Sequence, residues 1–419
     1  MMHEANVTQL GEVLESIVGG GTPSRKNEGF YEGNIPWVTV KDLVHHHLDK
    51  AQEYITEEAV MKSATNLIPK GTVIIATRMA LGKAFINLVD VAINQDLKAL
   101  IPNKDLIDSE FLLHTIIGNA SAIQSMGSGT TVMGIRLEQL KSLSIFVPKL
   151  YEQHKIANML NSVDSAISKT DAIIEQTEKV KKGLMQQLLT KGIGHTKFKQ
   201  TEIGEIPETW EVNAFGQIFS LIKSGISRRL VPDDVGYPVI RSSNIGNAQL
   251  ILDDLKYWYF EDDQGVDLKN LILEDGDILV NFINSLAQIG KCCLFTKQDR
   301  DFIYTTNIFR MRVKPDVLLN RYFHYYSQTT RYETDLQSIV KPAVNQASFT
   351  KSDFENLQIG LPPVSEQNKI VEILTSLDDK LTSENLKLNQ LLTLKKGLMQ
   401  VLLTGKVRVK VDDPEVVST

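Results

Sequence analysis

Cysteine is nearly absent from this chain of 419 residues: it has only two, Cys292 and Cys293, and they are adjacent. Two neighbouring thiols cannot cross-link distant segments, which excludes a small fold held together by disulfides. The pair follows Gly-Lys in an apolar run, so packing is favoured over a redox role. We therefore expect a reducing, cytoplasmic setting.

Long apolar runs and an excess of basic charge are also missing. No stretch approaches the roughly 18 apolar residues of a membrane-spanning helix, and the first residues lack the pattern of a signal peptide, so no membrane contact is expected. The net charge is −6; residues 1–147 carry 12 basic and 16 acidic side chains, and residues 198–361 carry 17 and 22. Any nucleic-acid contact must therefore come from local placement of cations or from a partner.

Recognisable catalytic motifs are a third absence. The only Pro-Pro pair, Pro362–Pro363, is followed by valine, so the Asn/Asp-Pro-Pro-aromatic motif of amino-methyltransferases does not occur. The segment GGGTPS (19–24) lacks the Gly-Lys-Ser/Thr ending of a phosphate-binding loop. His45–His47 have no cysteine or carboxylate cluster at ligand spacing, which favours a loop or an edge strand over a metal site. The chain is expected to hold no metal.

An internal repeat is the strongest feature that is present. The hexapeptide KKGLMQ occurs at 181–186 and again at 395–400, and the same offset of 214 aligns 148–190 with 362–404 without a gap. In that alignment 18 of 43 positions are identical. Each copy opens with a proline and continues with helical periodicity, so we predict two long helices from one duplication.

Apolar side chains recur in both helices at steps of three and four, which predicts a heptad-like seam. Thr170, Thr177 and Lys181 interrupt the first seam, and Glu384 and Lys395 interrupt the second. Two independent amphipathic surface helices are the alternative, but narrow seams favour helices that pack on each other. The first seam comprises Ile156, Leu160, Val163, Ile167, Ile174, Leu184 and Leu188, and the second comprises Ile370, Leu374, Leu377, Leu381, Leu388, Leu391, Leu398 and Leu402.

Gly183 and Gly397 occupy equivalent positions inside these predicted helices. Glycine in a helix interior costs roughly 0.5–1 kcal/mol relative to alanine. Such a cost at both positions suggests close backbone approach, either where the helices cross or by a partner. A glycine tolerated near a fraying helix end is the alternative.

The segments before the two helices, 1–147 and 198–361, resemble each other only weakly. NIPWVTVKDL (34–43) aligns with GYPVIRSSNI (236–245), for example. Short β-branched runs cut by turn residues predict strands, with shorter helices around 106–124 and 316–336. The fold class is therefore α+β, with two globular domains that are each followed by a long helix. The two helices are similar in sequence, whereas the two globular domains have diverged. This contrast indicates that the helices share one role and that the two domains have different roles.

At this point the chain strongly resembles the specificity subunits of Type I restriction–modification systems. GGGTPSRKNEGFYEGNIPWVTVKDL (19–43) is similar to the opening of a target recognition domain in that family. VPKLYEQHKIANMLNSVDSAI and LPPVSEQNKIVEILTSLDDKL are similar to the entries of its two conserved helical regions. The resemblance covers residues 8–410, although IKSGISRRLVPDDVGYPVIRSSNI in the second domain lacks the Thr-Pro and the Trp of that opening.

The resemblance implies a division of labour. Residues 1–147 and 198–361 would be target recognition domains, each reading one half of a bipartite sequence in double-stranded DNA. Residues 148–197 and 362–410 would be helical regions that pack as an antiparallel coiled coil with a pseudo-two-fold repeat, as a spacer and a dock. The implied partners are two methyltransferase subunits and motor–nuclease subunits. Those partners would use S-adenosylmethionine for adenine-N6 methylation, and ATP and Mg for restriction; this chain would be non-catalytic and hold no cofactor.

Base readers are expected among polar side chains in turns, because Arg and Lys pair with guanine, Asn and Gln with adenine, and Ser or Thr with either. Arg78 and Lys83 are favoured because they flank Gly82 after an apolar run, and Arg241 and Asn244 align with Thr39 and Asp42. The candidates in the first domain are Arg25, Lys26, Thr39, Lys41, Arg78, Lys83 and Thr130, and those in the second are Arg228, Arg229, Arg241, Ser243, Asn244, Asn281, Asn284, Lys291, Lys341 and Asn345.

Two other functions compete with DNA reading. A stand-alone DNA-modifying enzyme would require a catalytic constellation that the sequence does not display. A coiled-coil scaffold whose globular domains bind proteins fits the acidic charge somewhat better, but it leaves the polar turn residues without a role.

Overall fold

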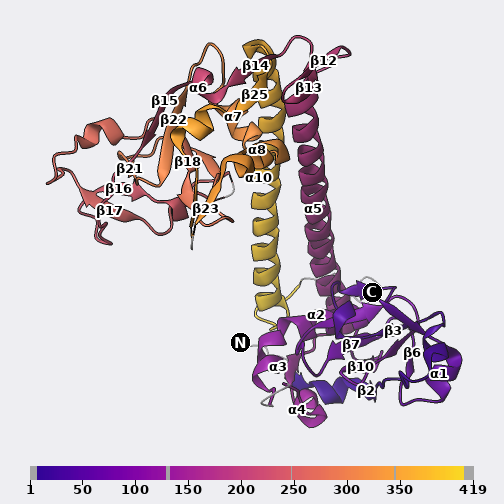
Figure 1. Ribbon diagram of the computed structural model, residues 1–419. Helices are drawn as coiled ribbons and strands as arrows, with labels where there is room; N and C mark the ends of the chain where they lie inside the picture. Colours follow the sequence, from indigo (N-terminus) through magenta and orange to yellow (C-terminus); the bar gives the residue numbers. More distant parts are fainter. Residues whose placement is uncertain (1–6, 129–132, 247, 344–345, 410–419) are drawn as a thin grey trace, which may run out of the picture. The chain divides into compact units, whose positions relative to one another are not determined.

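The computed structural model describes residues 7–128, 133–246, 248–343 and 346–409. It divides into two compact units: unit 1 comprises residues 1–172 and 385–419, and unit 2 comprises residues 173–384. The two predicted long helices are confirmed as α5 (Leu150–Lys191) and α10 (Val364–Leu402). Each helix contributes one half to each unit (Figure 1).

Unit 1 is built on two mixed sheets. The five-stranded sheet has the order β2 (Leu14–Gly19), β10 (Leu97–Pro102), β7 (Val73–Ala76), β8 (Ala84–Asn87), β4 (His47–Leu48). The four-stranded sheet has the order β5 (Glu53–Ile55), β3 (Ile35–Val38), β9 (Val91–Ile93), β6 (Leu67–Ile68). Neighbouring strands are antiparallel except in the pairs β3–β9 and β4–β8. The shorter helices are α1 (Glu57–Met61), α2 (Ser109–Gly118), α3 (Ala120–Ser125) and α4 (Leu137–Lys141).

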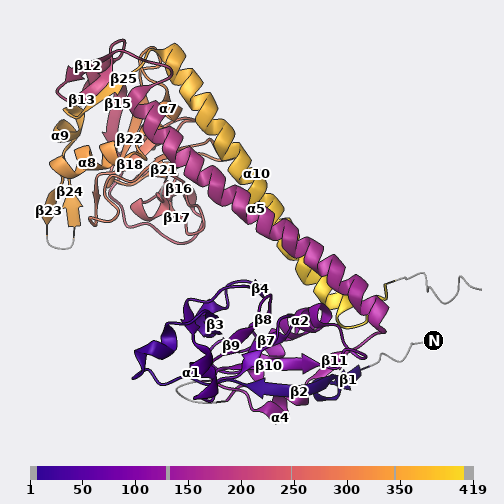
Figure 2. The same cartoon turned by 90° about the vertical axis from the view of Figure 1, so that its right-hand side faces the viewer.

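Strand β7 explains how unit 1 buries its sheets. All four of its residues are buried, and because side chains alternate along a strand they divide between two cores. Val73 and Ile75 face a core that α2 shares with α5 and α10, whereas Ile74 and Ala76 pack in a separate apolar cluster. Figure 2 shows α2 lying on the five-stranded sheet beside the helices.

Unit 2 repeats this plan with different side chains. Its main sheets have the orders β15 (Phe219–Ser224), β22 (Ile308–Val313), β18 (Ile278–Asn281), β20 (Cys292–Leu294) and β17 (Lys256–Tyr259), β16 (Gly236–Ile240), β21 (Ile303–Tyr304). A third sheet has the order β19 (Ile283–Asn284), β24 (Gln346–Ser348), β23 (Lys341–Ala343). The helices α7 (Asn320–Tyr326) and α8 (Thr330–Ile339) occupy the region predicted around 316–336, although α8 ends three residues beyond it. Both cysteines are buried in β20, as packing predicts.

The two units share their connectivity as well as their strands. The parallel pair β3–β9 of unit 1 corresponds to the parallel pair β16–β21 of unit 2. The turn before β7 in unit 1 contains Gly71 (φ +80°), and the turn before β18 in unit 2 contains Gly276 (φ +81°). Both glycines have the left-handed backbone conformation that favours this residue. Weak sequence similarity therefore reflects two copies of one fold.

The repeated Glu-Gln pair at the start of each long helix has a specific structural role. In unit 1 the Gln153 amide donates to the carbonyls of Leu106 and Pro148, both at 2.8 Å, and its oxygen accepts from the Asp108 amide. Gln367 makes the same three bonds to the corresponding backbone groups in unit 2. Both glutamines are fully buried, so each joins its helix to the globular domain before it.

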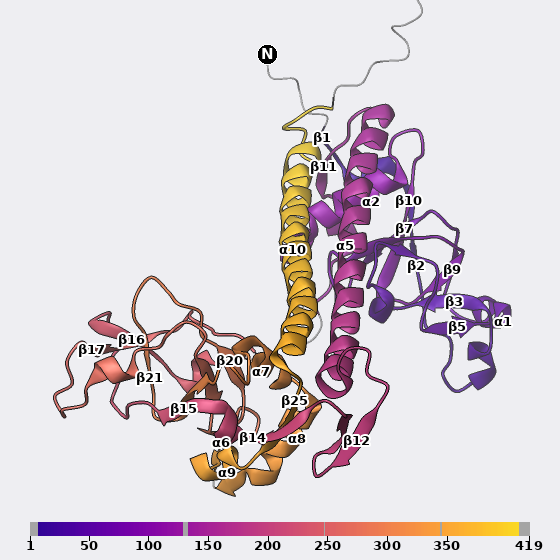
Figure 3. The same ribbon diagram turned by 90° about the horizontal axis from the view of Figure 1, so that it is seen from above.

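Within each unit the halves of α5 and α10 lie side by side and antiparallel (Figure 3). The predicted seam residues face inward, with none of them exposed. The expectation that polar residues break the seam is wrong for Thr170 and Thr177, which are buried within it. Lys181 and Lys395 also continue the seam, because each is largely buried and paired with an aspartate.

Three further findings concern the described part of the chain. None of its helices combines the length and apolar character needed to cross a membrane. His47 lies in the short strand β4, in keeping with the loop or edge-strand prediction. The described side chains form no group of three or more His, Cys, Asp or Glu suited to a metal ion.

Candidate nucleic-acid interface

Four segments of unit 1 meet where the parallel strands β3 and β9 end. The Asn94 amide donates to the Val38 carbonyl at 3.1 Å, and the Gly21 amide donates to the Ile93 carbonyl at 3.0 Å. The Thr77 amide donates to the Asp96 carbonyl at 2.9 Å, which adds the loop after β7. We call residues 20–26, 38–42, 77–83 and 94–98 the reading edge of unit 1.

Unit 2 has the same backbone connections at the ends of β16 and β21. The amide of Thr305 donates to the Ile240 carbonyl at 3.0 Å, and the amide of Ile226 donates to the Tyr304 carbonyl at 3.0 Å. The Phe282 amide donates to the Asn307 carbonyl at 3.1 Å. Residues 225–229, 240–244, 281–291 and 305–307 therefore form the reading edge of unit 2.

The predicted correspondence of Thr39–Asp42 with Arg241–Asn244 is confirmed as a shared turn. The Asp42 carboxylate accepts from the Thr39 amide at 2.8 Å, and the Asn244 side-chain oxygen accepts from the Arg241 amide at 3.0 Å. Asn244 is 2% exposed. Its side chain holds the turn and cannot contact a base without leaving the interior, so we exclude it from the readers.

Asn281 is likewise excluded by its burial. It is 0% exposed at the end of β18, where its amide donates to the Ser242 carbonyl. Asn284 is partly buried, and its side-chain oxygen accepts from the Ser285 amide. The sequence predicts base contacts for these side chains because of their amide chemistry. In the structure, their hydrogen-bonding groups are instead bonded to backbone groups of the reading edge. Thr130 and Asn345 lie outside the described residues.

Several predicted arginines are engaged with carboxylates. Arg25 makes two bonds to Glu53, at 2.6 and 2.7 Å, and its guanidinium lies over the rings of Tyr31 and Trp37. This pairing lowers the pKa of Glu53 and raises that of Arg25. Two-point pairing with a carboxylate fixes the plane of the guanidinium, so Arg25 orders the loop between β2 and β3.

Arg228 and Arg241 of unit 2 are also paired with carboxylates. Arg228 makes two bonds to Asp262, at 2.7 and 2.8 Å, and holds the pKa of that carboxyl well below its usual range. Arg241 bonds Asp254 at 2.8 Å. Lys341 forms an ion pair with Asp353 while its side chain remains 66% exposed. For Arg228, whose side chain is 11% exposed, a structural role outweighs a reading role.

Other predicted readers at the reading edges are available to a ligand. The cations Lys26, Lys41, Lys83 and Arg229 and the hydroxyl-bearing Ser243 are exposed, and Lys291 is partly exposed. The Arg78 side chain is 52% exposed, and its guanidinium lies 3.6 Å from Asp96, beyond hydrogen-bond distance.

Sequence reasoning missed the segment that follows β9. Exposed Gln95 accepts a hydrogen bond from the Thr22 hydroxyl at 2.6 Å, and Asp96 lies beside Arg78. Burial lowers the pKa of Lys98, which is next in the same segment. The signal was a polar Asn-Gln-Asp run directly after an apolar strand, equivalent to Thr305–Asn307 in unit 2.

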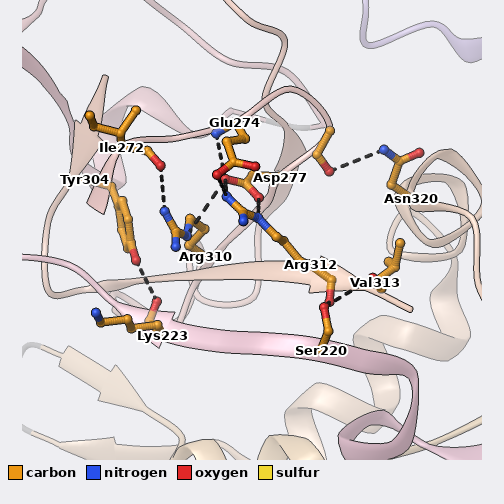
Figure 4. A network of polar contacts seen from close by, with 11 residues as sticks. Ser220, Lys223, Ile272, Glu274, Asp277, Tyr304, Arg310, Arg312, Val313 and Asn320 are labelled. Carbon is orange, nitrogen blue, oxygen red and sulfur yellow. Dashed lines mark hydrogen bonds and ion pairs between the residues drawn. The ribbon is translucent and has the colours of Figure 1, made fainter. Parts of the chain in front are cut away.

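A partly buried ionic network packs against Tyr304 of β21, the strand that leads into the reading edge of unit 2 (Figure 4). Asp277, 1% exposed, accepts from the Arg312 Nε at 2.7 Å and lies 3.8 Å from the Arg310 Nε. Arg310 also donates to the Ile272 carbonyl and lies over the ring of Tyr304, whose pKa burial raises to about 12. In unit 1 the corresponding strand position is Ala99, which pairs with β2 and β7 as Arg310 pairs with β15 and β18.

Comparisons with known proteins agree with this architecture. A family model described as "Type I restriction modification DNA specificity domain" matches residues 2–179 and 207–394. A putative type I restriction enzyme MjaX specificity subunit of Methanocaldococcus jannaschii is 33% identical over 210 residues, 50% of this chain and 49% of that protein. The MjaVIII specificity subunit of the same organism is 24% identical over 96% of this chain and 93% of its own length.

The fold itself has solved counterparts. The crystal structure of a Type-I restriction-modification system S subunit from M. genitalium is similar with a TM-score of 0.59 and 16% identity. The similarity covers 96% of this chain and 97% of that one. It therefore extends over both units and both long helices.

Proposed function

This chain belongs to the family of Type I restriction–modification DNA specificity subunits, and from that premise we propose that it reads a bipartite sequence in double-stranded DNA. Each reading edge would contact one half of that sequence. As a specificity subunit the chain selects DNA and does not carry out catalysis.

The observation that carries the proposal is that the two reading edges have the same backbone arrangement but different side chains. Three equivalent backbone hydrogen bonds tie each edge together. Gln95 and Asp96 of unit 1 stand where unit 2 has Thr306 and Asn307. Amide, hydroxyl and guanidinium groups of this kind make the contacts that distinguish base pairs in the major groove. A shared frame with different polar groups supports the reading of two different half-sites.

The long helices support a second part of the proposal, the docking of two methyltransferase subunits. A side chain built at Gly183 or Gly397 would meet nothing within 4 Å, so close approach of the two helices does not explain either glycine. Beside them, Val180 and Leu394 are 45% and 50% exposed and lie at equivalent positions of the repeat. An exposed apolar side chain at the same position of both helices, next to bare helix backbone, fits two copies of one partner.

The chemistry would belong to the partners. We propose that the methyltransferase subunits use S-adenosylmethionine to methylate adenine at N6. Motor–nuclease subunits would join for restriction with ATP and Mg. The scaffold alternative has less support, because it leaves the exposed Gln95, Arg78 and Lys83 of the edge without a ligand.

Mapping methylated adenines tests the proposal. The full chain is co-expressed with its methyltransferase, and methylated sites are mapped with the wild type, with Gln95→Ala and with Thr306→Ala. We expect a bipartite site in which Gln95→Ala relaxes only one half and Thr306→Ala only the other. A site that lacks two separate halves, or variants that both alter the same half, would contradict the proposal.

A further inference from the structure

An exposed methionine with an unusual backbone marks the reading edge of unit 1. Met79 has φ +64°, a left-handed conformation that L side chains rarely adopt. The Ala80 amide donates to the Arg78 carbonyl at 2.8 Å, which closes a γ-turn of the rare, strained kind around Met79. The side chain is nevertheless 67% exposed, so burial does not compensate for this strain.

The loop that carries Met79 is held in place on both sides. The Met79 amide donates to the Met133 carbonyl, and the Ile135 amide donates to the Thr77 carbonyl. On the other side the side-chain amide of Gln124 donates to the Leu81 carbonyl at 3.1 Å. Gly82 packs against α3 so closely that a side chain would lie 2.9 Å from the Ala120 Cα. The structure therefore presents an apolar side chain to solvent on a fixed backbone.

The corresponding loop of unit 2 has the same character. It runs from Phe282 to Lys291, and Leu286 at its tip is 68% exposed. The Ile289 amide donates to the Ser285 carbonyl, and strand β19 pairs with β24 beside it. Single exposed apolar residues are common on protein surfaces. The same placement in both units, on two restrained loops of different length and sequence, points to a shared role.

The surroundings of these tips favour DNA over a protein ligand. Exposed Arg78 and Lys83 flank Met79 in the same loop, and partly exposed Lys291 ends the loop of Leu286. Lys83 and Lys291 would bind phosphates beside the base step that the tip enters, whereas Arg78 would contact a base edge next to that step. Met and Leu are among the side chains that proteins insert between base pairs, where they unstack a step and kink the duplex.

We propose that Met79 and Leu286 are wedges, each inserting at a base step of the half-site bound by its unit. This inference rests on the proposed function, because it assigns DNA distortion to the same edges. The specificity of the chain would then include the ease with which a step is unstacked, in addition to direct contacts with base edges.

The test uses the full chain with its co-expressed methyltransferase, on duplexes that carry its mapped target. A single mismatch is scanned through the target, and 2-aminopurine is placed at adenines other than the methylated ones. Wild type should bind more tightly when the mismatch lies at one step in each half-site, and 2-aminopurine beside that step should brighten. Met79→Gln should abolish both effects in one half-site and weaken binding to intact duplex about tenfold; Leu286→Gln should do so in the other.

Controls keep the two proposals separable. Met61→Gln makes the same change at a 77% exposed methionine on α1 and should match wild type. Met79→Gly removes the side chain without backbone strain and should behave like Met79→Gln. If the wild type binds its target specifically but no step responds, the wedge is overturned while DNA reading stands. If the wild type does not distinguish target from scrambled duplex, the proposed function itself fails. Loss of methyltransferase co-purification in Met79→Gln would make the loop a protein contact and overturn the wedge.

Discussion

Asp164 on α5 and Lys395 on α10 form an ion pair of 2.6 Å in unit 1, with side chains that are only 22% and 14% exposed. A shift of 214 residues exchanges the two helices and gives the pair Asp378–Lys181, at 2.5 Å in unit 2. Both lysines continue the apolar seam. A charged residue at such a position lowers stability but specifies register and orientation, so the duplicated pairs select the antiparallel alignment within each unit.

Removal of one lysine should destabilise the unit that contains it. Lys395→Ala leaves the partly buried carboxylate of Asp164 without its partner, and we expect a loss of about 1–3 kcal/mol in the free energy of unfolding. Denaturant titration of the full chain measures this loss. Lys396→Ala, at an exposed neighbour, is the matched control and should change stability by less than about 0.5 kcal/mol. An equal loss of stability in both variants would show that the Asp164–Lys395 ion pair does not account for the loss.

Arg78 should read one base position. Loss of a two-point contact to guanine costs about 1–3 kcal/mol of discrimination at a single base pair. Arg78→Ala should therefore relax one position of the site selected from a randomised pool. Lys70→Ala, at an exposed residue outside the reading edge, should leave the selected sequence unchanged. A uniform loss of affinity across all sequences would make Arg78 a phosphate contact.

The separate roles of the two units lead to a chimera experiment. Replacement of residues 205–355 by the equivalent segment of a relative keeps α5, α10 and the reading edge of unit 1. We expect the methylated site to change in one half only. A change in both halves would contradict the assignment of one half to each unit.

Largely buried His324 should make unit 2 sensitive to acid. Its pKa is lowered from 6.5 to about 4, mainly by burial; Asp378 opposes this shift, and Lys181 and Arg321 add to it. The unfolded chain therefore binds a proton at a higher pH than the folded one, so stability is lost as pH falls from about 6.5 toward 4. At pH 5 this amounts to about 2 kcal/mol. His324→Gln should reduce the difference between the unfolding free energies at pH 7 and pH 5, measured by denaturant titration of the full chain. An unchanged difference would contradict this role of His324.

The helices were predictable from sequence because their repeat is nearly unbroken and their periodicity is strong. The Gln153 and Gln367 bonds show why the motif persists: each glutamine satisfies backbone groups at a buried junction. The reading edges were harder. Asn244 and Asn281 have the chemistry of base readers, but tertiary structure uses them to hold turns. Gln95 was missed because its proximity to Thr22 depends on strands that are far apart in sequence.

Alanine variants of Gly183 and Gly397 should have opposite effects on the stability of the chain and on its binding of methyltransferase subunits. Both lie within α-helices, and a methyl group at either position meets no atom within 4 Å. Gly183→Ala should therefore stabilise the chain alone by about 0.5–1 kcal/mol, because alanine restricts the unfolded backbone and favours the helix. If the bare backbone receives a methyltransferase subunit, the same methyl group should weaken that complex.

Titration of the full chain with purified methyltransferase measures this second effect. We expect Gly183→Ala to lose one of two equivalents of bound subunit and Gly397→Ala to lose the other, while the double variant binds neither at concentrations that saturate the wild type. Lys182→Ala, at an exposed neighbour of Gly183, controls for any change on this surface. Alanine variants that gain stability and keep both equivalents would show that the glycines are merely tolerated, and would remove them from the docking surface.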